Sequence, residues 1–278
     1  MIFLVDNGSM KPAAYKNLCT IASSLSDEIG EKVVPAPLLH ADKIPVEDLP
    51  GEKVKLLEAA ITEAYNAGER CFVVIPLFFG PSGALIDYLP RRLSILQKRC
   101  PNLQVQILNP MFKSPQDGGA ELAAILKERT QETLVAHKLD EYSVIVVDHG
   151  SPRREVTQVR DAVAELLQNE WAEEEILVIP ASMERRAGEQ FDFNEPLLET
   201  ALKNSASNST AIIVAQLFIS PGRHAGPNGD IVNICEAEIA RNSQLKILRT
   251  ELIGTHPLLI KLLAKRWNER DSVPFLEL

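Results

Sequence analysis

Short apolar runs alternate with longer amphipathic stretches along the whole chain. The runs are rich in Val and Ile, as strands are, and the stretches have the apolar spacing of one helix face. This alternation predicts strand–helix units with right-handed crossovers, and therefore parallel sheets. The expected strands are MIFLV, KVVPA, CFVVIPLFF, LQVQIL, YSVIVV, EILVIPA, STAIIVAQLFI and LKILRT, and the expected helices span 11–25, 52–67, 85–98, 118–132, 156–168, 195–204, 231–242 and 257–269.

The second half of this pattern repeats the first. LVDNGS (4–9) matches VVDHGS (146–151), and PLFFGPSGA (76–84) matches QLFISPGRH (216–224). Asn7 and His149 are 142 residues apart, and Ala84 and His224 are 140 apart, as a duplication with small length changes requires. We therefore predict two similar α/β domains, 1–138 and 139–278, each a four-stranded parallel sheet flanked by helices.

Composition excludes several classes of protein. The 278 residues are 45% hydrophobic, which is enough for a core and argues against a disordered chain. Lys and Arg number 29 against 38 Asp and Glu, a formal charge of −9 that argues against nucleic acid as a partner. The start MIFLVDNGSM is unlike a signal peptide, and no run has the length of a membrane span. We expect a cytoplasmic protein with no membrane partner.

The four cysteines form no C-x-x-C pair. Cys71 and Cys235 stand in apolar surroundings, which predicts that both are buried. We expect all four to be reduced thiols, in keeping with the predicted cytoplasmic location.

Three residues able to bind a metal follow the first three strands of the second half. His149 ends the first strand, Glu184 follows the second, and His224 follows the third. Ligands of open parallel sheets bind beyond the carboxyl ends of the strands, where the strand order reverses. With strand order 2-1-3-4, the two imidazoles and the carboxylate meet in one crevice and suit Fe, Co, Ni or Zn.

Arginines surround the same edge of the predicted sheet. On an acidic protein they suggest an anionic ligand with several carboxylates, although an ordinary solvated loop surface would also contain them. They are Arg153, Arg154, Arg185, Arg186 and Arg223. Ser151 is expected to cap the following helix. A hydrolase with Ser151 as nucleophile and His224 as base is a weaker hypothesis, because the G-x-S-x-G turn is missing.

The first half lacks these candidate ligands. Asn7 stands where His149 stands, and Ala84 where His224 stands. His40 lies near the position that matches Glu184, without a second imidazole to join it. We therefore expect a single site, in the second half, with the first half as a scaffold that walls the cleft.

Three motifs of the second half resemble those of the class II chelatases, the sirohydrochlorin cobalto- and ferrochelatases of the CbiX and SirB type. They are VVDHGS, the PASMER…FNEP stretch over 180–196, and LFISPGRHAGPNGDI. The resemblance implies a long, duplicated form that inserts Co, Fe or Ni into a sirohydrochlorin-type tetrapyrrole, as in cobalamin or siroheme biosynthesis. It assigns metal binding and proton removal to His149 and His224, and an acidic role to Glu184 or its rival Glu195.

The implied chemistry treats the divalent metal as a substrate, with no tightly bound cofactor. The five arginines and Ser151 would bind the anionic tetrapyrrole. Two alternatives stay open: a non-catalytic carrier of tetrapyrrole or metal, or a regulatory paralogue; and an unrelated hydrolase or isomerase on the same fold. The chain is expected to be a monomer or a homodimer.

Overall fold

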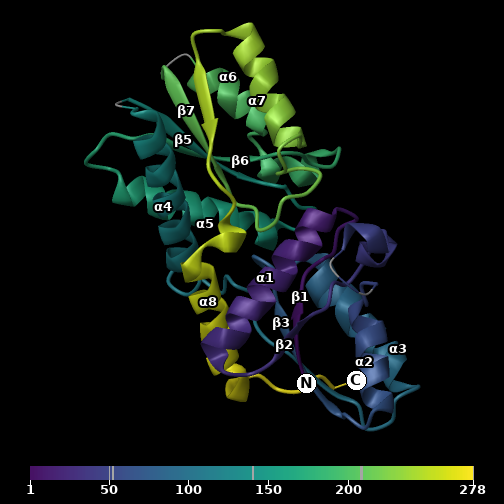
Figure 1. Ribbon diagram of the computed structural model, residues 1–278. Coiled ribbons are helices and arrows are strands. Elements are labelled where there is room, and N and C mark those ends of the chain that lie inside the picture. Colours follow the sequence, from purple (N-terminus) through teal and green to yellow (C-terminus); the bar gives the residue numbers. More distant parts are fainter. Residues whose placement is uncertain (50, 52, 140, 207–208, 278) are drawn as a thin grey trace. The chain divides into compact units, whose positions relative to one another are not determined.

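Two four-stranded parallel sheets form the framework of the protein, in the computed structural model that describes residues 1–49, 51, 53–139, 141–206 and 209–277 (Figure 1). Their strand orders are β2-β1-β3-β4 and β6-β5-β7-β8, which confirms the predicted α/β class and the 2-1-3-4 order. The strands are β1 (Ile2–Val5), β2 (Val33–Pro35), β3 (Cys71–Pro76), β4 (Gln104–Ile107), β5 (Ser143–Asp148), β6 (Val178–Ser182), β7 (Ala211–Gln216) and β8 (Lys246–Arg249).

A helix follows each strand, as predicted. The α-helices are α1 (Pro12–Ile29), α2 (Leu57–Asn66), α3 (Leu89–Gln97), α4 (Gly119–His137), α5 (Arg154–Glu170), α6 (Leu198–Ser205), α7 (Asp230–Arg241) and α8 (Pro257–Asn268). The helix expected from residue 52 begins five residues later, and Glu52 itself lies outside the described residues. The helix expected from residue 195 begins at Leu198, because Glu195 has extended backbone and Pro196 follows it.

The compact units of the molecule differ from the two sequence repeats. Unit 1 comprises 1–113 and 260–278, and unit 2 comprises 114–259. Helix α4, which ends the first repeat, packs with α5 and β7 in unit 2. In exchange, the end of the chain packs in unit 1, where buried Arg266 donates hydrogen bonds to the carbonyls of Pro110 (2.9 Å) and Met111 (2.6 Å). The predicted division at 138/139 separates the two sequence repeats. In the structure, α4 of the first repeat belongs to unit 2, and most of α8 of the second repeat belongs to unit 1.

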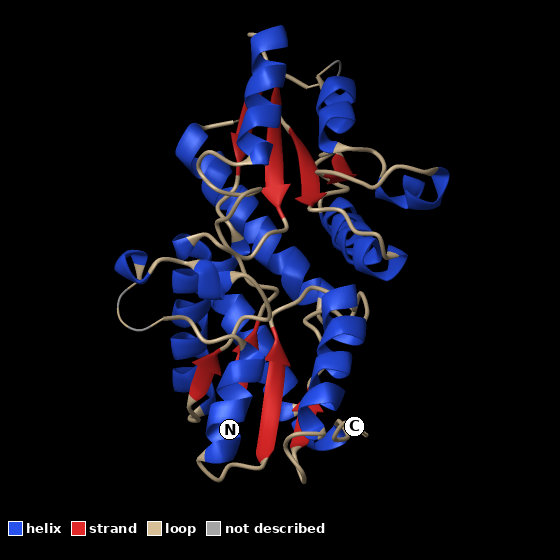
Figure 2. Cartoon of the chain, turned by 90° about the vertical axis from the view of Figure 1, so that its right-hand side faces the viewer, coloured by secondary structure: helices blue, strands red, loops and turns tan. Residues whose placement is uncertain are grey.

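Unit 2 buries both faces of its sheet. Ile145 and Val147 of β5 pack with α6 and α7 through Leu198, Leu202 and Ile231. Successive strand residues face opposite sides, so the alternate residues of β5 face α4 and α5, which contact the same sheet. All six residues of β5 and all six of β7 are buried. This three-layer arrangement, seen in Figure 2, leaves the carboxyl ends of the central strands to carry loops.

Unit 1 is built in the same way. Phe3 and Phe72, on neighbouring strands, stack with ring centroids 6.1 Å apart. Their face of the sheet packs against α2 and α3 through Ile61, Leu89 and Leu93. The shared strand order and the shared helix positions are the structural record of the duplication.

The prediction that Cys71 is buried is wrong. Cys71 is the first residue of β3 and is exposed, and its thiol donates to Gln104 Oε1 (3.1 Å). Cys235 is buried as predicted, and all four cysteines are free thiols. Over the described parts of the chain, no helix has the length and apolar character that crossing a bilayer requires.

Candidate functional site

The first and third strands of unit 2 bring two histidines together. The paired residues Val147 of β5 and Gln216 of β7 are neighbours, so the loops that follow these strands start side by side. His149 and His224 meet there with their Nε2 atoms 3.3 Å apart and their ring centroids at 4.5 Å. Their side chains are 48% and 27% exposed, which leaves the pair open to a ligand from solvent.

Both imidazoles are held by their other nitrogen. His149 Nδ1 lies 2.9 Å from the carbonyl oxygen of Gly150, and His224 Nδ1 lies 2.7 Å from Asp230 Oδ2. Because a carbonyl and a carboxylate accept hydrogen bonds, each Nδ1 must carry the proton. In the neutral rings, the lone pairs of the two Nε2 atoms therefore face and repel each other. A cation bound between them would relieve this repulsion.

Glu184 is the third candidate metal ligand. It follows β6, and its Oε1 lies 3.3 Å from His149 Nε2. Its rival Glu195 is engaged elsewhere, because its two oxygens accept hydrogen bonds from Arg185 Nε (2.6 Å) and the Leu197 backbone N–H (2.9 Å). The geometry therefore favours Glu184 as the acidic residue of the site.

The donor spacing matches that of metal ligands. Metal–nitrogen bonds of about 2.0–2.1 Å at a tetrahedral angle place two ligand atoms about 3.3–3.4 Å apart. The Nε2–Nε2 and Nε2–Oε1 distances are both 3.3 Å. Among the described residues, no group of three or more His, Cys, Asp or Glu side chains has an arrangement that could hold a metal ion. The two imidazoles are therefore a pair of candidate ligands, with Glu184 beside His149.

A buried polar network supports the turn that carries His149. Asp148 Oδ1 accepts hydrogen bonds from the Gly150 N–H (3.0 Å) and the Ser182 hydroxyl (2.6 Å). Arg160, which is 1% exposed, lies 3.9 Å from the same oxygen and also bonds Ser182. Burial raises the pKa of Asp148, while the Ser182 hydrogen bond and the Arg160 charge oppose that rise. The network fixes the backbone on both sides of His149.

Gly150 is required by the close approach of two loops. Its φ is +87°, and a Cβ there would lie 1.9 Å from the carbonyl oxygen of Glu184. The Glu184 N–H in turn bonds the His149 carbonyl (3.2 Å). The glycine of the HGS motif thus allows the loops that carry His149 and Glu184 to touch.

Asn194 is a structural residue that the sequence did not single out. Fully buried, it accepts hydrogen bonds from the Ser151 N–H (2.9 Å) and the Thr157 hydroxyl (3.0 Å), and donates to the Ser151 and Phe191 carbonyls (3.0 Å each). It ties the FNEP stretch to the HGS turn. Its place in the FNEP stretch was the only sequence feature that could have indicated it. Its hydrogen-bond partners depend on loop conformations, which strand and helix patterns do not predict.

The predicted capping role of Ser151 is wrong. Helix α5 begins at Arg154, and its N-cap residue is Arg153. The Ser151 hydroxyl accepts instead from the Arg153 N–H (3.1 Å), in a turn before the helix. Pro152 and Arg153 separate Ser151 from the first residue of α5, so Ser151 stands too early by two residues to be its N-cap, which is Arg153.

The five candidate arginines differ in how free they are. Arg185 is bound internally, to Glu195 and at 3.1 Å to Asp192. Arg153 is half-buried, with its Nε 4.0 Å from Glu155. The others are exposed: Arg154, the first residue of α5, stacks on Phe193 (4.7 Å), Arg186 lies over Phe191 (6.0 Å), and Arg223 is 80% exposed. These three are the most accessible cations of the group.

Unit 1 has no counterpart of the candidate metal ligands His149, Glu184 and His224. Gly8 (φ +84°) approaches the Leu39 carbonyl as Gly150 approaches that of Glu184, so Leu39 is the structural counterpart of Glu184. His40, predicted to lie near the position that matches Glu184, is the residue that follows Leu39. Asn7, Leu39 and Ala84 replace His149, Glu184 and His224.

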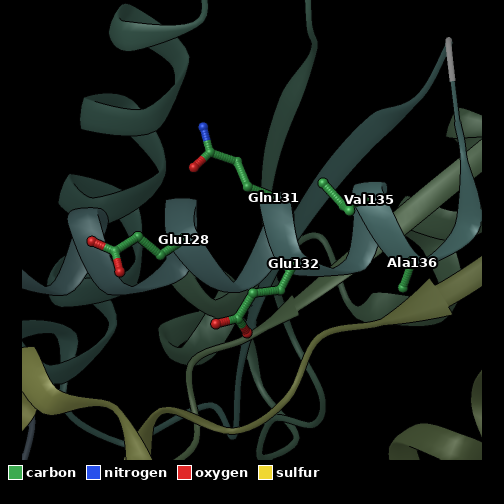
Figure 3. Close-up of a pocket in the computed structure, with 5 residues that line it drawn as sticks. All are labelled: Glu128, Gln131, Glu132, Val135 and Ala136. Atoms are coloured by element: carbon green, nitrogen blue, oxygen red, sulfur yellow. The ribbon is translucent and has the colours of Figure 1, made fainter.

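A separate hollow of about 510 Å³ lies on α4 (Figure 3). It is lined by Glu128, Gln131, Glu132, Val135 and Ala136. Glu128 pairs with His256 Nε2 (3.1 Å). This hollow shares no residue with the histidine site and does not extend it.

Comparisons with known proteins point to one family. Residues 143–270 match the CbiX family model. The fold resembles SirB from Bacillus subtilis with Fe³⁺ (TM-score 0.69, 15% identity, 97% of this chain and 94% of that one). It also resembles the sirohydrochlorin chelatase SirB from Bacillus subtilis subspecies spizizenii in complex with cobalt (TM-score 0.68, 16% identity, 98% of this chain and 94% of that one).

A third structure, CbiX, described as the terminal enzyme of siroheme biosynthesis in denitrifying bacteria, has a TM-score of 0.59 at 15% identity, with 96% of each chain covered. The comparison with curated protein sequences yields no match. The family model covers the segment that carries both histidines and Glu184. Residues 143–270, in the second repeat, thus match the CbiX family, and the two-sheet fold of the whole chain resembles that of SirB.

Proposed function

We propose that this protein inserts a divalent metal ion, Co²⁺, Fe²⁺ or Ni²⁺, into a sirohydrochlorin-type tetrapyrrole. The observation that carries the proposal is that His149 Nε2 lies 3.3 Å from both His224 Nε2 and Glu184 Oε1, at an exposed strand edge. Two structures of similar fold were determined with Fe³⁺ or with cobalt, which supports a metal ion as a substrate here.

Insertion exchanges two pyrrole N–H protons for one M²⁺ ion, so the site must hold the ion and also receive protons. His149 and His224 present their lone pairs to the ion and orient it toward the ring, a template role. Glu184, 59% exposed and beside His149, is placed to accept a proton and release it to solvent. The ion is a substrate that leaves with the product.

The accessible arginines supply binding energy remote from the reacting centre. Arg154, Arg186 and Arg223 are placed to pair with the peripheral carboxylates of the macrocycle. Binding energy from these carboxylates can then support distortion of the ring during insertion. Unit 1, which lacks the ligands, serves as a scaffold under this proposal. The cytoplasmic location stays a prediction from the sequence.

The test is metallation itself. Purified protein is incubated with sirohydrochlorin and Co²⁺, Fe²⁺ or Ni²⁺, and the absorption change of metallation is followed against a no-enzyme control. We expect acceleration by the wild type and none by the His149→Ala/His224→Ala variant. Binding of both substrates without acceleration would support the carrier or paralogue hypothesis instead.

A further inference from the structure

The loop before α7 places an acidic side chain directly behind His224. Asp230 Oδ2 lies 2.7 Å from His224 Nδ1, on the opposite side of the ring from the Nε2 that faces His149. We propose that Asp230 is a positioning residue that holds His224 in its metal-binding tautomer and orientation, an inference that rests on the proposed function.

The backbone of this loop is built to make that contact. Between His224 and Asp230 the chain folds back, with the Ile231 N–H bonded to the His224 carbonyl (3.1 Å). A Cβ at Gly229 would lie 2.4 Å from the same carbonyl, and one at Gly226 would lie 2.6 Å from the Gly222 carbonyl. Glycines at 226 and 229 therefore permit the tight return that brings the carboxylate to the ring.

Two other roles for Asp230 fit the contacts less well. The N-cap of α7 is Gly229, and no side-chain cap hydrogen bond is formed there. The Arg223 guanidinium is 3.8 Å from Asp230 and 80% exposed, so solvent screens that pair. The short contact is the one to His224. A negative side chain in the first turn of a helix is also favoured by the helix dipole.

The two histidines are held by different kinds of acceptor. His149 Nδ1 donates to a neutral backbone carbonyl, whereas His224 Nδ1 donates to a carboxylate. A carboxylate behind an imidazole increases the electron density at the opposite nitrogen and fixes the tautomer. Asp230 therefore makes His224 the stronger of the two donors.

The repeat in unit 1 supports a functional link between ligand and partner. There, Ala84 replaces His224, and the residue 140 positions before Asp230 is Pro90. The chain enters a helical turn directly at Ala84, without the glycine loop. Unit 1 therefore lacks counterparts of both His224 and Asp230, as expected if Asp230 acts through His224.

The first test measures Co²⁺ affinity by calorimetric titration of the full chain. Removing the outer partner of a ligating histidine typically weakens metal binding about 10–100-fold, which we expect for Asp230→Ala. Asp230→Asn should lose less, because its amide oxygen still accepts from Nδ1–H. Glu199→Gln, a change at an exposed acid in the first turn of α6, is the matched control and should keep wild-type affinity. Unchanged affinity in Asp230→Ala would overturn the inference.

The second test separates positioning from a general structural effect. In a His224→Ala background, Asp230→Ala should weaken Co²⁺ binding no further, whereas an equal loss in both backgrounds would overturn the inference. Nitrogen NMR of the metal-free protein should find the His224 proton on Nδ1 in the wild type, and finding it on Nε2 would also overturn it. Co²⁺ binding that depends on Asp230, in a protein that does not metallate sirohydrochlorin, would refute the proposed function and leave this inference standing.

Discussion

Asp6 and Asp148 occupy equivalent positions at the ends of β1 and β5, yet Asp6 lacks the side-chain partners that Asp148 has. Asp148 Oδ1 accepts from Gly150 and Ser182, with Arg160 nearby, whereas Asp6 Oδ1 is buried and has no partner among the described residues. Pro37 and Leu18 occupy the positions in unit 1 that correspond to Ser182 and Arg160. The duplication has therefore left one oxygen of a buried carboxyl group without a donor, and the backbone hydrogen bonds of Gly8 and Asp6 only partly offset its burial.

We expect Asp6→Asn to stabilise the protein at neutral and alkaline pH. Burial raises the pKa of Asp6 to about 6 from 3.8. The folded state thus binds a proton at Asp6 more tightly than the unfolded state does. The stability that this proton contributes is fully present below about pH 4 and is lost as pH rises through 6. The shift corresponds to about 2–3 kcal/mol. Urea denaturation should show that gain at pH 8 and almost none at pH 4.

The control for this experiment is Asp148→Asn. Asp148 Oδ1 accepts hydrogen bonds from the Gly150 N–H and the Ser182 hydroxyl and lies 3.9 Å from Arg160, which Asp161 also pairs at 2.6 Å, so this change should not stabilise the protein at pH 8 as Asp6→Asn does. A gain in stability for both variants, or for neither, would contradict the distinction drawn between the two carboxyl groups.

Gly150→Ala should disrupt the site as well as the fold. The positive φ and the contact with the Glu184 carbonyl together predict a loss of about 1–3 kcal/mol in unfolding free energy. Any relaxation moves Glu184 relative to His149, so metallation should fall too. Gly222→Ala is the matched control, because a Cβ there has no heavy atom within 4 Å. Equal behaviour of the two variants in melting and activity would be evidence against the required close approach.

Strand order and the two histidines could be predicted from sequence, because both depend on strand positions. Parallel strands of order 2-1-3-4 bring the ends of β5 and β7 together whatever the loops do. Asn194 and Arg160 could not be identified, since a buried polar side chain is recognised only by its partners. The exchange of α4 and α8 also escaped detection, because an amphipathic pattern tells which face of a helix is buried but not against which sheet.

His149→Ala and His224→Ala should each reduce metallation to the no-enzyme rate while leaving the fold intact. Both side chains are partly exposed at a strand edge, so their loss creates no large cavity in the core. Circular dichroism and melting curves should match those of the wild type. His137→Ala, at the exposed end of α4, is the control and should metallate normally. Wild-type rates in either site variant would show that the reaction occurs elsewhere.

The repeats also predict one metal site per chain, which reconstruction of the lost ligands can test. Calorimetric titration should find one specific Co²⁺ ion in the wild type and none in His149→Ala/His224→Ala. The triple change Asn7→His, Leu39→Glu and Ala84→His restores the metal-binding residue types at the matching positions of unit 1. It should add a second Co²⁺ site. That site should be weaker, because unit 1 still lacks counterparts of the glycine loop and of Asp230. Asn7→Ala alone should leave both binding and metallation unchanged. Two equal sites in the wild type, or a site that survives loss of both histidines, would mean that the metal binds outside the edge formed by β5, β6 and β7.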